Sequence, residues 1–211
     1  MSRREIAQTL VDRHGQTFAE EAGITLRDKP SPLWRLLVLS LLLSARISSE
    51  IAVAAARELS KAGLRTPAAM RQATWQQRVD ALARGHYRRY DERTATMLGE
   101  VAELLLDRYH GDLRRLHQDS TDVEADLQQF KGIGPTGAAI FIREVQGVWP
   151  DLAPYVDSRA ADGAQRLGLP RSADRLAGLV DAADLPRLVA GCVRAALDET
   201  VVDDVRPRRP S

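Results

Sequence analysis

The chain has 211 residues and a formal net charge of +1, so it is long enough for one sizeable domain or for two small ones that share a core. Hydrophobic residues make up 44 % and charged residues 28 %, which is typical of an ordinary globular protein; the near-neutral balance excludes a strong overall attraction to polyanions but not a local basic face. Aromatic residues are only 5 %, so we expect a core of leucine, alanine and valine and an all-α fold.

The single cysteine, Cys192, excludes an intramolecular disulfide, a zinc site built on several thiolates and an iron–sulfur cluster held by four cysteines. Its apolar neighbours Leu188, Val189 and Val193 predict a buried, structural side chain. We therefore expect no metal and no cofactor. The first residues are charged and lack the apolar run of a signal peptide, which predicts a cytoplasmic protein.

Residues 33–45 (LWRLLVLSLLLSA) form the most apolar stretch of the chain. It is shorter than the roughly 20 residues that a membrane span needs, so it predicts a helix buried at the centre of a domain. One or two amphipathic helices precede it within residues 6–22, and a capped helix over residues 51–61 follows. The connection leaves Arg46 exposed, where it could contact DNA or simply be solvated.

The middle of the chain predicts short capped helices over residues 66–70 and 75–83 and a long helix from Asp91 to Tyr109. Between them, residues 84–90 (RGHYRRY) mix ring side chains and a glycine with arginines. This composition suits contact with a nucleic-acid backbone, although a solvated turn would have the same composition.

A glycine hairpin follows in residues 127–140 (LQQFKGIGPTGAAI), between two apolar segments with helical spacing. We expect its two glycines to adopt backbone angles that other residues avoid, and Pro135 to take the first position of the second helix. The positions whose N–H groups can bind a phosphate are Gly132, Gly134, Thr136 and Gly137. An ordinary turn between two helices would use the same glycines.

Beyond the hairpin, an irregular connection with two prolines continues until Asp157 or Ser158 opens a helix through Leu167, with Asp157 as a candidate N-cap. Closing helices are predicted over residues 176–180 and 185–201. Residues 203–211 (DDVRPRRPS) are polar and proline-rich, which predicts a disordered tail.

In this order, the buried LLLSA helix, the glycine hairpin and the YVDS segment resemble the helix-hairpin-helix DNA glycosylases of the endonuclease III branch. The resemblance covers roughly residues 30–168. It implies an all-α, two-lobed fold in which residues 33–131 form a helical barrel. Residues 1–32 and 132–202 would form the other lobe, which carries the second helix of the hairpin and Asp157.

The resemblance also implies a monofunctional DNA N-glycosylase of base excision repair. In such proteins the hairpin holds a DNA phosphate, the nucleotide is flipped out of the duplex, and an aspartate assists hydrolysis of the N-glycosidic bond. An ionised carboxylate near C1′ stabilises the oxocarbenium-like transition state. Asp157 is the expected catalytic residue. Capping alone would also explain this aspartate, and the two roles are compatible because a helix N-terminus favours a negative charge.

The chain departs from the family pattern at Thr136, at Arg46 and His86, and in lacking the four C-terminal cysteines that bind an iron–sulfur cluster in many relatives. Bifunctional members carry a lysine two residues after the second hairpin glycine, where this chain has Thr136, whose hydroxyl cannot form an imine. Lyase activity is therefore not expected, and Lys131 is interpreted as a phosphate contact, with a displaced nucleophile as the alternative. Arg46 and His86 stand where related enzymes place residues that fill the gap left by the flipped base. Because these residues differ in chemistry from those of the relatives, the lesion preference of the relatives does not apply to this chain.

The expected partner is double-stranded DNA with a damaged or mispaired base, bound by a nucleoid-associated monomer and away from membranes. The expected DNA-binding residues are Arg46, His86, Lys131, Gly132, Gly134, Thr136 and Gly137. Three other functions fit the same residues: an inactive DNA-binding helix-hairpin-helix protein, a bifunctional glycosylase/AP lyase with a displaced lysine, and a helical protein unrelated to DNA.

Overall fold

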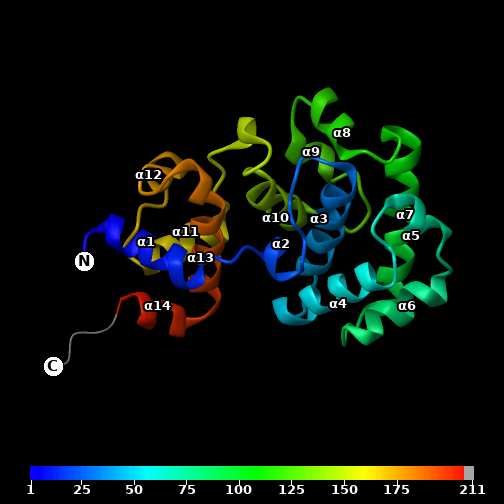
Figure 1. Cartoon of the computed structure of the whole chain (residues 1–211), viewed down its shortest axis with the longest axis horizontal. Coiled ribbons are helices and arrows are strands. Elements are labelled where there is room, and N and C mark those ends of the chain that lie inside the picture. The colour runs from blue at the N-terminus through cyan, green and yellow to red at the C-terminus, as the bar shows by residue number, and fades with distance from the viewer. Residues whose placement is uncertain (207–211) are drawn as a thin grey trace. The chain divides into compact units, whose positions relative to one another are not determined.

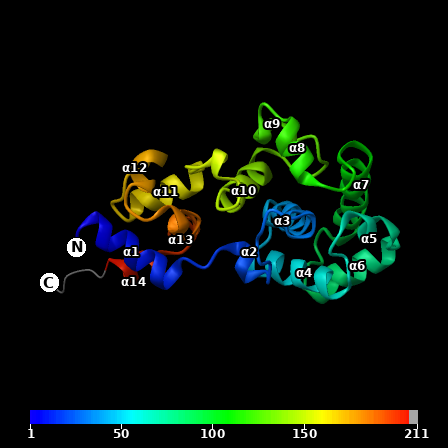
Figure 2. The ribbon, with the colours of Figure 1, turned by 45° about the horizontal axis from the view of Figure 1, so that its top comes forward.

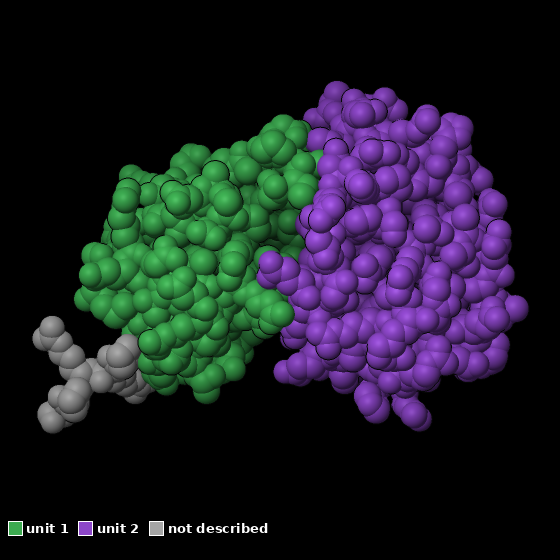
Figure 3. Space-filling model, in the orientation of Figure 1, with its two compact units in different colours: residues 1–18, 142–211 green, residues 19–141 purple. Residues whose placement is uncertain are grey.

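The computed structural model describes residues 1–206, and within them every regular element is a helix (Figure 1), which confirms the predicted all-α class. The contacts divide the chain into unit 1, residues 1–18 and the described residues from 142 on, and unit 2, residues 19–141 (Figure 3). The division crosses α2 (Phe18–Glu21) and α10 (Pro135–Val145).

Unit 2 contains α3 (Pro30–Leu43), α4 (Ser49–Lys61), α5 (Pro67–Gln72), α6 (Trp75–Arg84), α7 (Asp91–Tyr109), α8 (Leu113–Asp119) and α9 (Val123–Leu127). Unit 1 contains α1 (Arg3–His14), α11 (Ser158–Arg166), α12 (Ala173–Ala177), α13 (Leu185–Leu197) and α14 (Glu199–Val205), with 3₁₀ turns at Pro150–Leu152 and Ala182–Asp184.

The units do not end where the sequence placed the lobe boundaries, after residues 32 and 131. Residues 19–24 belong with unit 2 because two arginines of that unit hold them. The Arg35 guanidinium of α3 donates to the Gly23 carbonyl oxygen over 3.0 Å, and the Arg57 guanidinium of α4 donates to the Glu21 carbonyl oxygen. Residues 132–141 also belong there, since Gly132 packs against side chains of α3 and α7.

Helix α3 is the centre of unit 2, and Figure 2 shows it enclosed by the other helices of the unit. Leu36, Leu37 and Leu42, on different sides of the helix, are all 0 % exposed. Burial of each such side chain contributes about 1.5–3 kcal/mol, so the apolar stretch stabilises the unit from within. The buried Ser40 hydroxyl donates to the Leu36 carbonyl oxygen over 2.8 Å, which satisfies its polar group. The predicted central helix is confirmed.

In unit 1, α11 packs closely on α13, and α1 and α14 also contact α13. The approach is closest at Gly163, where a Cβ atom would lie 1.7 Å from the Cys192 carbonyl oxygen. Cys192 is 0 % exposed, as its apolar neighbours predict, and burial raises the pKa of its thiol to about 12. It is therefore an inert core residue.

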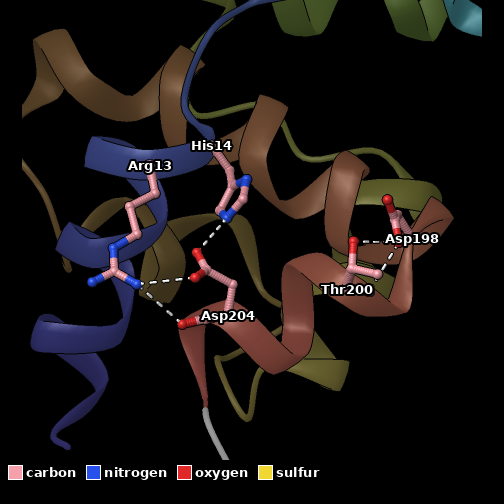
Figure 4. A network of polar contacts seen from close by, with 5 residues as sticks. All are labelled: Arg13, His14, Asp198, Thr200 and Asp204. Atoms are coloured by element: carbon pink, nitrogen blue, oxygen red, sulfur yellow. Dashed lines mark hydrogen bonds and ion pairs between the residues drawn. The ribbon is translucent and has the colours of Figure 1, made fainter.

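The end of the described chain differs from the sequence prediction. The closing helix predicted over residues 185–201 is broken at Asp198, which caps α14 by accepting from Thr200 N over 2.8 Å. Residues 203–205, predicted as disordered, are helical: Val205 is 1 % exposed, and Arg13 and His14 of α1 contact Asp204 (Figure 4). Arg206 follows α14 as an exposed residue, and residues 207–211 of the predicted tail lie outside the described residues.

The contact between α1 and α14 predicts a dependence of stability on acid. The hydrogen bond from His14 and the charge of Arg13 lower the pKa of Asp204. A lowered pKa contributes stability above the pKa of an unfolded aspartate, about 3.9, and that contribution is lost as the pH falls through the lower folded value. We expect Asp204→Asn to lower the unfolding temperature at pH 7 and to match the wild type once the pH lies below the lowered pKa of Asp204 in the folded protein. Thermal unfolding at a series of pH values from neutral into acid measures this difference in unfolding temperature.

Asp12→Asn is the control, because it removes a carboxylate from α1 without touching the contact between α1 and α14; Asp12 accepts from Gln8 Nε2 over 2.9 Å. An equal loss for the two variants at pH 7 would contradict the assigned role of Asp204.

Within residues 1–206 no helix combines the length and the apolarity that crossing a membrane requires.

Candidate functional site

The glycine hairpin joins α9 to α10 through residues 128–134. Gly132 has φ +88°, a left-handed conformation that glycine adopts without strain. A Cβ atom at this position would also lie 3.0 Å from the sulfur of Met97 and 3.2 Å from Cδ1 of Leu41. Both conformation and packing therefore require glycine at residue 132, as the sequence predicts.

Gly134 differs from this prediction, because its φ lies outside the left-handed region and nothing lies within 4 Å of the position a Cβ atom would take. Its carbonyl oxygen accepts from Ala138 N over 2.9 Å, the first hydrogen bond of α10. The fold itself thus sets no requirement for glycine here. A side chain at residue 134 would occupy the open space in front of the N-terminus of α10.

Helix α10 begins at Pro135, as predicted. Among the described residues, no acceptor receives the N–H groups of Gly134, Thr136 or Gly137, which are the unsatisfied donors of a helix N-terminus. Gly134 and Thr136 are exposed, whereas Gly137 is buried. These donors and the positive end of the helix dipole can hold an anion such as a phosphate.

The predicted cationic residues of unit 2 are exposed. Lys131 Nζ lies 2.8 Å from Oε1 of Glu100, with side chains 64 % and 40 % exposed, so the pair contributes little stability and a phosphate can compete for the lysine. Arg46 makes no hydrogen bond or ion pair with a described residue. Its turn lies beside the hairpin, since Cβ of Ser44 is 3.6 Å from the Cβ position of Gly137.

His86 is exposed and has φ +63°, an uncommon conformation in which histidine is enriched among non-glycine residues. The next residue, Tyr87, is buried, and its hydroxyl lies 3.2 Å from that of Thr94. The buried tyrosine thus anchors the loop and turns the His86 side chain toward solvent.

Asp157 lies in unit 1 and is the N-cap of α11, as the capping interpretation predicts. Its Oδ1 accepts from Ala160 N over 2.8 Å. Its Oδ2 accepts from Nη1 of Arg143 over 2.7 Å, and the two side chains are 10 % and 6 % exposed. The two hydrogen bonds, one to each oxygen, fix the orientation of this side chain.

Sequence reasoning missed Arg143. The only signal was an arginine within the apolar helical run AAIFIREV, which by itself is read as a solvated position. No group of three or more histidine, cysteine, aspartate or glutamate side chains within residues 1–206 is arranged to hold a metal ion.

Comparison of the sequence with protein-family models and with curated proteins gives no match. Solved structures with a similar fold include two complexes of endonuclease III with DNA, one a trapped covalent intermediate with an estranged adenine and the other non-covalent. Each is 17 % identical to this chain, and each match spans 92 % of this chain and 85 % of the endonuclease III chain. The TM-scores are 0.51 and 0.52. The chain therefore has the helix-hairpin-helix fold of endonuclease III.

Proposed function

We propose that this protein is a DNA N-glycosylase of base excision repair, which hydrolyses the bond between a damaged or mispaired base and its sugar. The observation that carries the proposal is the open hairpin N-terminus at Gly134, in a fold shared with endonuclease III that is solved in complex with DNA. In this proposal the protein acts on double-stranded DNA as a cytoplasmic, nucleoid-associated monomer.

In the proposed reaction the hairpin N–H groups and Lys131 hold the DNA backbone. Arg46 and His86 contact the duplex from exposed turns of unit 2. The lesioned nucleotide must leave the stack, because its glycosidic bond is inaccessible in the duplex. The Asp157 carboxylate stabilises the positive charge that develops at C1′ as the base departs, and water completes the hydrolysis. Thr136 supplies no amine, so the reaction forms no Schiff base there.

A panel of duplexes, each with one damaged or mispaired base, tests this proposal. We expect the protein to excise the base from at least one of them, and mild alkali then cuts the strand at the abasic site. Absence of excision from every duplex in the panel would contradict the glycosylase proposal.

The two hairpin glycines give a matched pair for the DNA-binding role. Gly134→Ala adds a methyl group to open space, so we expect unchanged or slightly higher stability, by about 0.4–1 kcal/mol, and roughly tenfold weaker binding to duplex DNA. Gly132→Ala forces a left-handed alanine against Met97 and Leu41, so we expect it to lose about 2–4 kcal/mol of stability. Thermal unfolding and duplex titration at two salt concentrations measure both effects.

Equal DNA affinity in Gly134→Ala and the wild type would show that no phosphate approaches this residue. A loss of stability in Gly134→Ala would instead contradict the open environment of the position.

The partners of Asp157 favour a second candidate, an inactive DNA-binding protein of the same fold. Both carboxylate oxygens already accept a hydrogen bond from the protein, as a purely structural aspartate would. Salt-dependent duplex binding without excision on the panel would support this candidate.

A bifunctional enzyme with Lys131 as a displaced nucleophile makes a different prediction. Its amine would form an imine with C1′ of an abasic site, which borohydride traps as a covalent adduct. We expect no adduct with the wild type. An adduct that is lost in Lys131→Ala, but kept in Lys61→Ala, would establish the lyase; Lys61 is a matched exposed lysine paired with Glu58.

A further inference from the structure

Arg143 is a buried cation in the second half of α10, and the described side chain is only 6 % exposed. Its neighbours Phe141, Ile142 and Val145 are buried core residues. Removal of a guanidinium from water is costly, and arginine is almost never buried without a partner that compensates for this cost. The burial of Arg143 therefore indicates that its guanidinium has a specific partner.

The contacts of Arg143 lock its side chain in one orientation. Nη1 donates to Oδ2 of Asp157 over 2.7 Å, and the guanidinium carbon lies 5.7 Å from the centre of the Phe18 ring. The buried Nε has no partner among the described residues. The arginine thus directs its charge to a single acceptor, the carboxylate of Asp157.

A second side chain, directly after the end of α10, fixes the backbone just before Asp157. Gln146 follows Val145, the last residue of α10, and its backbone N–H donates to the Ile142 carbonyl oxygen over 3.0 Å. Its Oε1 accepts from Tyr155 N over 2.9 Å, and its Nε2 donates to the Tyr155 carbonyl oxygen over 3.0 Å. Gln146 therefore sets the backbone two residues before Asp157, and Arg143 of α10 sets the direction of its carboxylate.

Capping alone does not require such an arrangement. Asp122 caps α9 through a similar bond, from Ala125 N to Oδ1 over 3.0 Å, and its residue is exposed, with no ion pair to an arginine. An N-cap in this chain is thus made without a buried cation. What Arg143 adds at Asp157 is a fixed position for the second oxygen.

We propose that Arg143 is a positioning residue for base excision, which orients the Asp157 carboxylate toward the charge that develops on the sugar. The inference rests on the proposed glycosylase function. Electrostatic stabilisation of a transition state depends on a charge that is already in place, and a small displacement of the group lowers the rate of the chemical step without changing substrate binding. The cap bond fixes Oδ1, and Arg143 fixes Oδ2.

The test measures the single-turnover excision rate at saturating lesion duplex, and separately the dissociation constant of the duplex, for the wild type and two variants. For Arg143→Gln we expect excision to be ten- to a hundredfold slower and duplex affinity to stay within about twofold. Arg143→Lys keeps the charge but not the rigid fork, so we expect it to restore part of the rate.

Arg194→Gln is the matched control. The Arg194 guanidinium carbon lies 4.6 Å from the centre of the same Phe18 ring, and Nη2 donates to the Gln16 carbonyl oxygen over 3.0 Å. This variant disturbs the same part of unit 1, and we expect it to lower the unfolding temperature while excision keeps the wild-type rate.

The outcomes separate the inference from the function on which it rests. Failure of the wild type to excise any base removes both. Excision by the wild type with an equal rate in folded Arg143→Gln removes only the positioning role, and so does an equal loss of rate in Arg194→Gln. If Arg143→Gln does not fold, Arg143→Lys decides: a wild-type rate contradicts the inference, and slower excision with unchanged duplex affinity supports it.

Discussion

Asp157→Asn will slow base excision by about a hundredfold or more while duplex binding remains. Asparagine caps helices as well as aspartate does, so Oδ1 can still accept from Ala160 N. It carries no charge, however, and cannot stabilise the positive sugar of the transition state. The measurement is the single-turnover excision rate on the lesion that the wild type excises best, with duplex affinity determined in parallel.

The same substitution will also cost stability, because it leaves Arg143 as a buried cation without a counter-charge. Breaking a buried ion pair on one side costs about 3–5 kcal/mol, a large part of the 5–15 kcal/mol that stabilises a typical domain. Excision must therefore be measured well below the unfolding temperature of the variant. Asp122→Asn, at the exposed cap of α9, serves as the control that should change neither quantity.

Wild-type excision by folded Asp157→Asn would remove the carboxylate from the mechanism and leave it with the structural role that its two hydrogen bonds describe. Slow excision with intact binding would distinguish the glycosylase from the inactive DNA-binding alternative, because the latter has no wild-type rate to lose.

Local signals in the sequence were sufficient for much of the fold. Helix α7 was predicted with both of its ends, because its apolar period is regular and Gly111 follows it. The start of α10 at Pro135 and the left-handed Gly132 followed from the fixed φ of proline and the freedom of glycine. The N-cap at Asp157 followed from the short side chain before Ser158.

Contacts between distant residues account for what the sequence did not predict. The polar end of α14 is ordered by His14 and Arg13, about 190 residues earlier in the chain. Its composition alone indicated disorder, because a local pattern does not reveal so distant a contact. Arg143 meets Asp157 only because the end of α10, from Ile142 on, belongs to the same unit as α11, and no local pattern in AAIFIREV encodes this pairing. The open space at Gly134 likewise depends on how the hairpin is folded.

Gly163→Ala will disrupt unit 1, because its added Cβ would lie 1.7 Å from the Cys192 carbonyl oxygen and 2.7 Å from the carbonyl carbon. These are backbone atoms of α13, which cannot rotate away as a side chain could. Helices α11 and α13 would have to separate, which would also displace the N-cap at Asp157. Overpacking typically costs about 1–3 kcal/mol of stability, and because backbone atoms are involved here we expect a loss of about 3 kcal/mol or more.

Gly178→Ala is the control for this prediction in the same unit. Its Cβ would lie 3.5 Å from the Asp174 carbonyl oxygen, an ordinary contact, and its φ of −66° suits any residue. We therefore expect it to be neutral or slightly stabilising, since alanine restricts the unfolded chain. Denaturant unfolding compares the two variants. Equal stability would mean that α11 can move away from α13 at little cost, and the close approach at Gly163 would then not be what fixes the start of α11 and its aspartate.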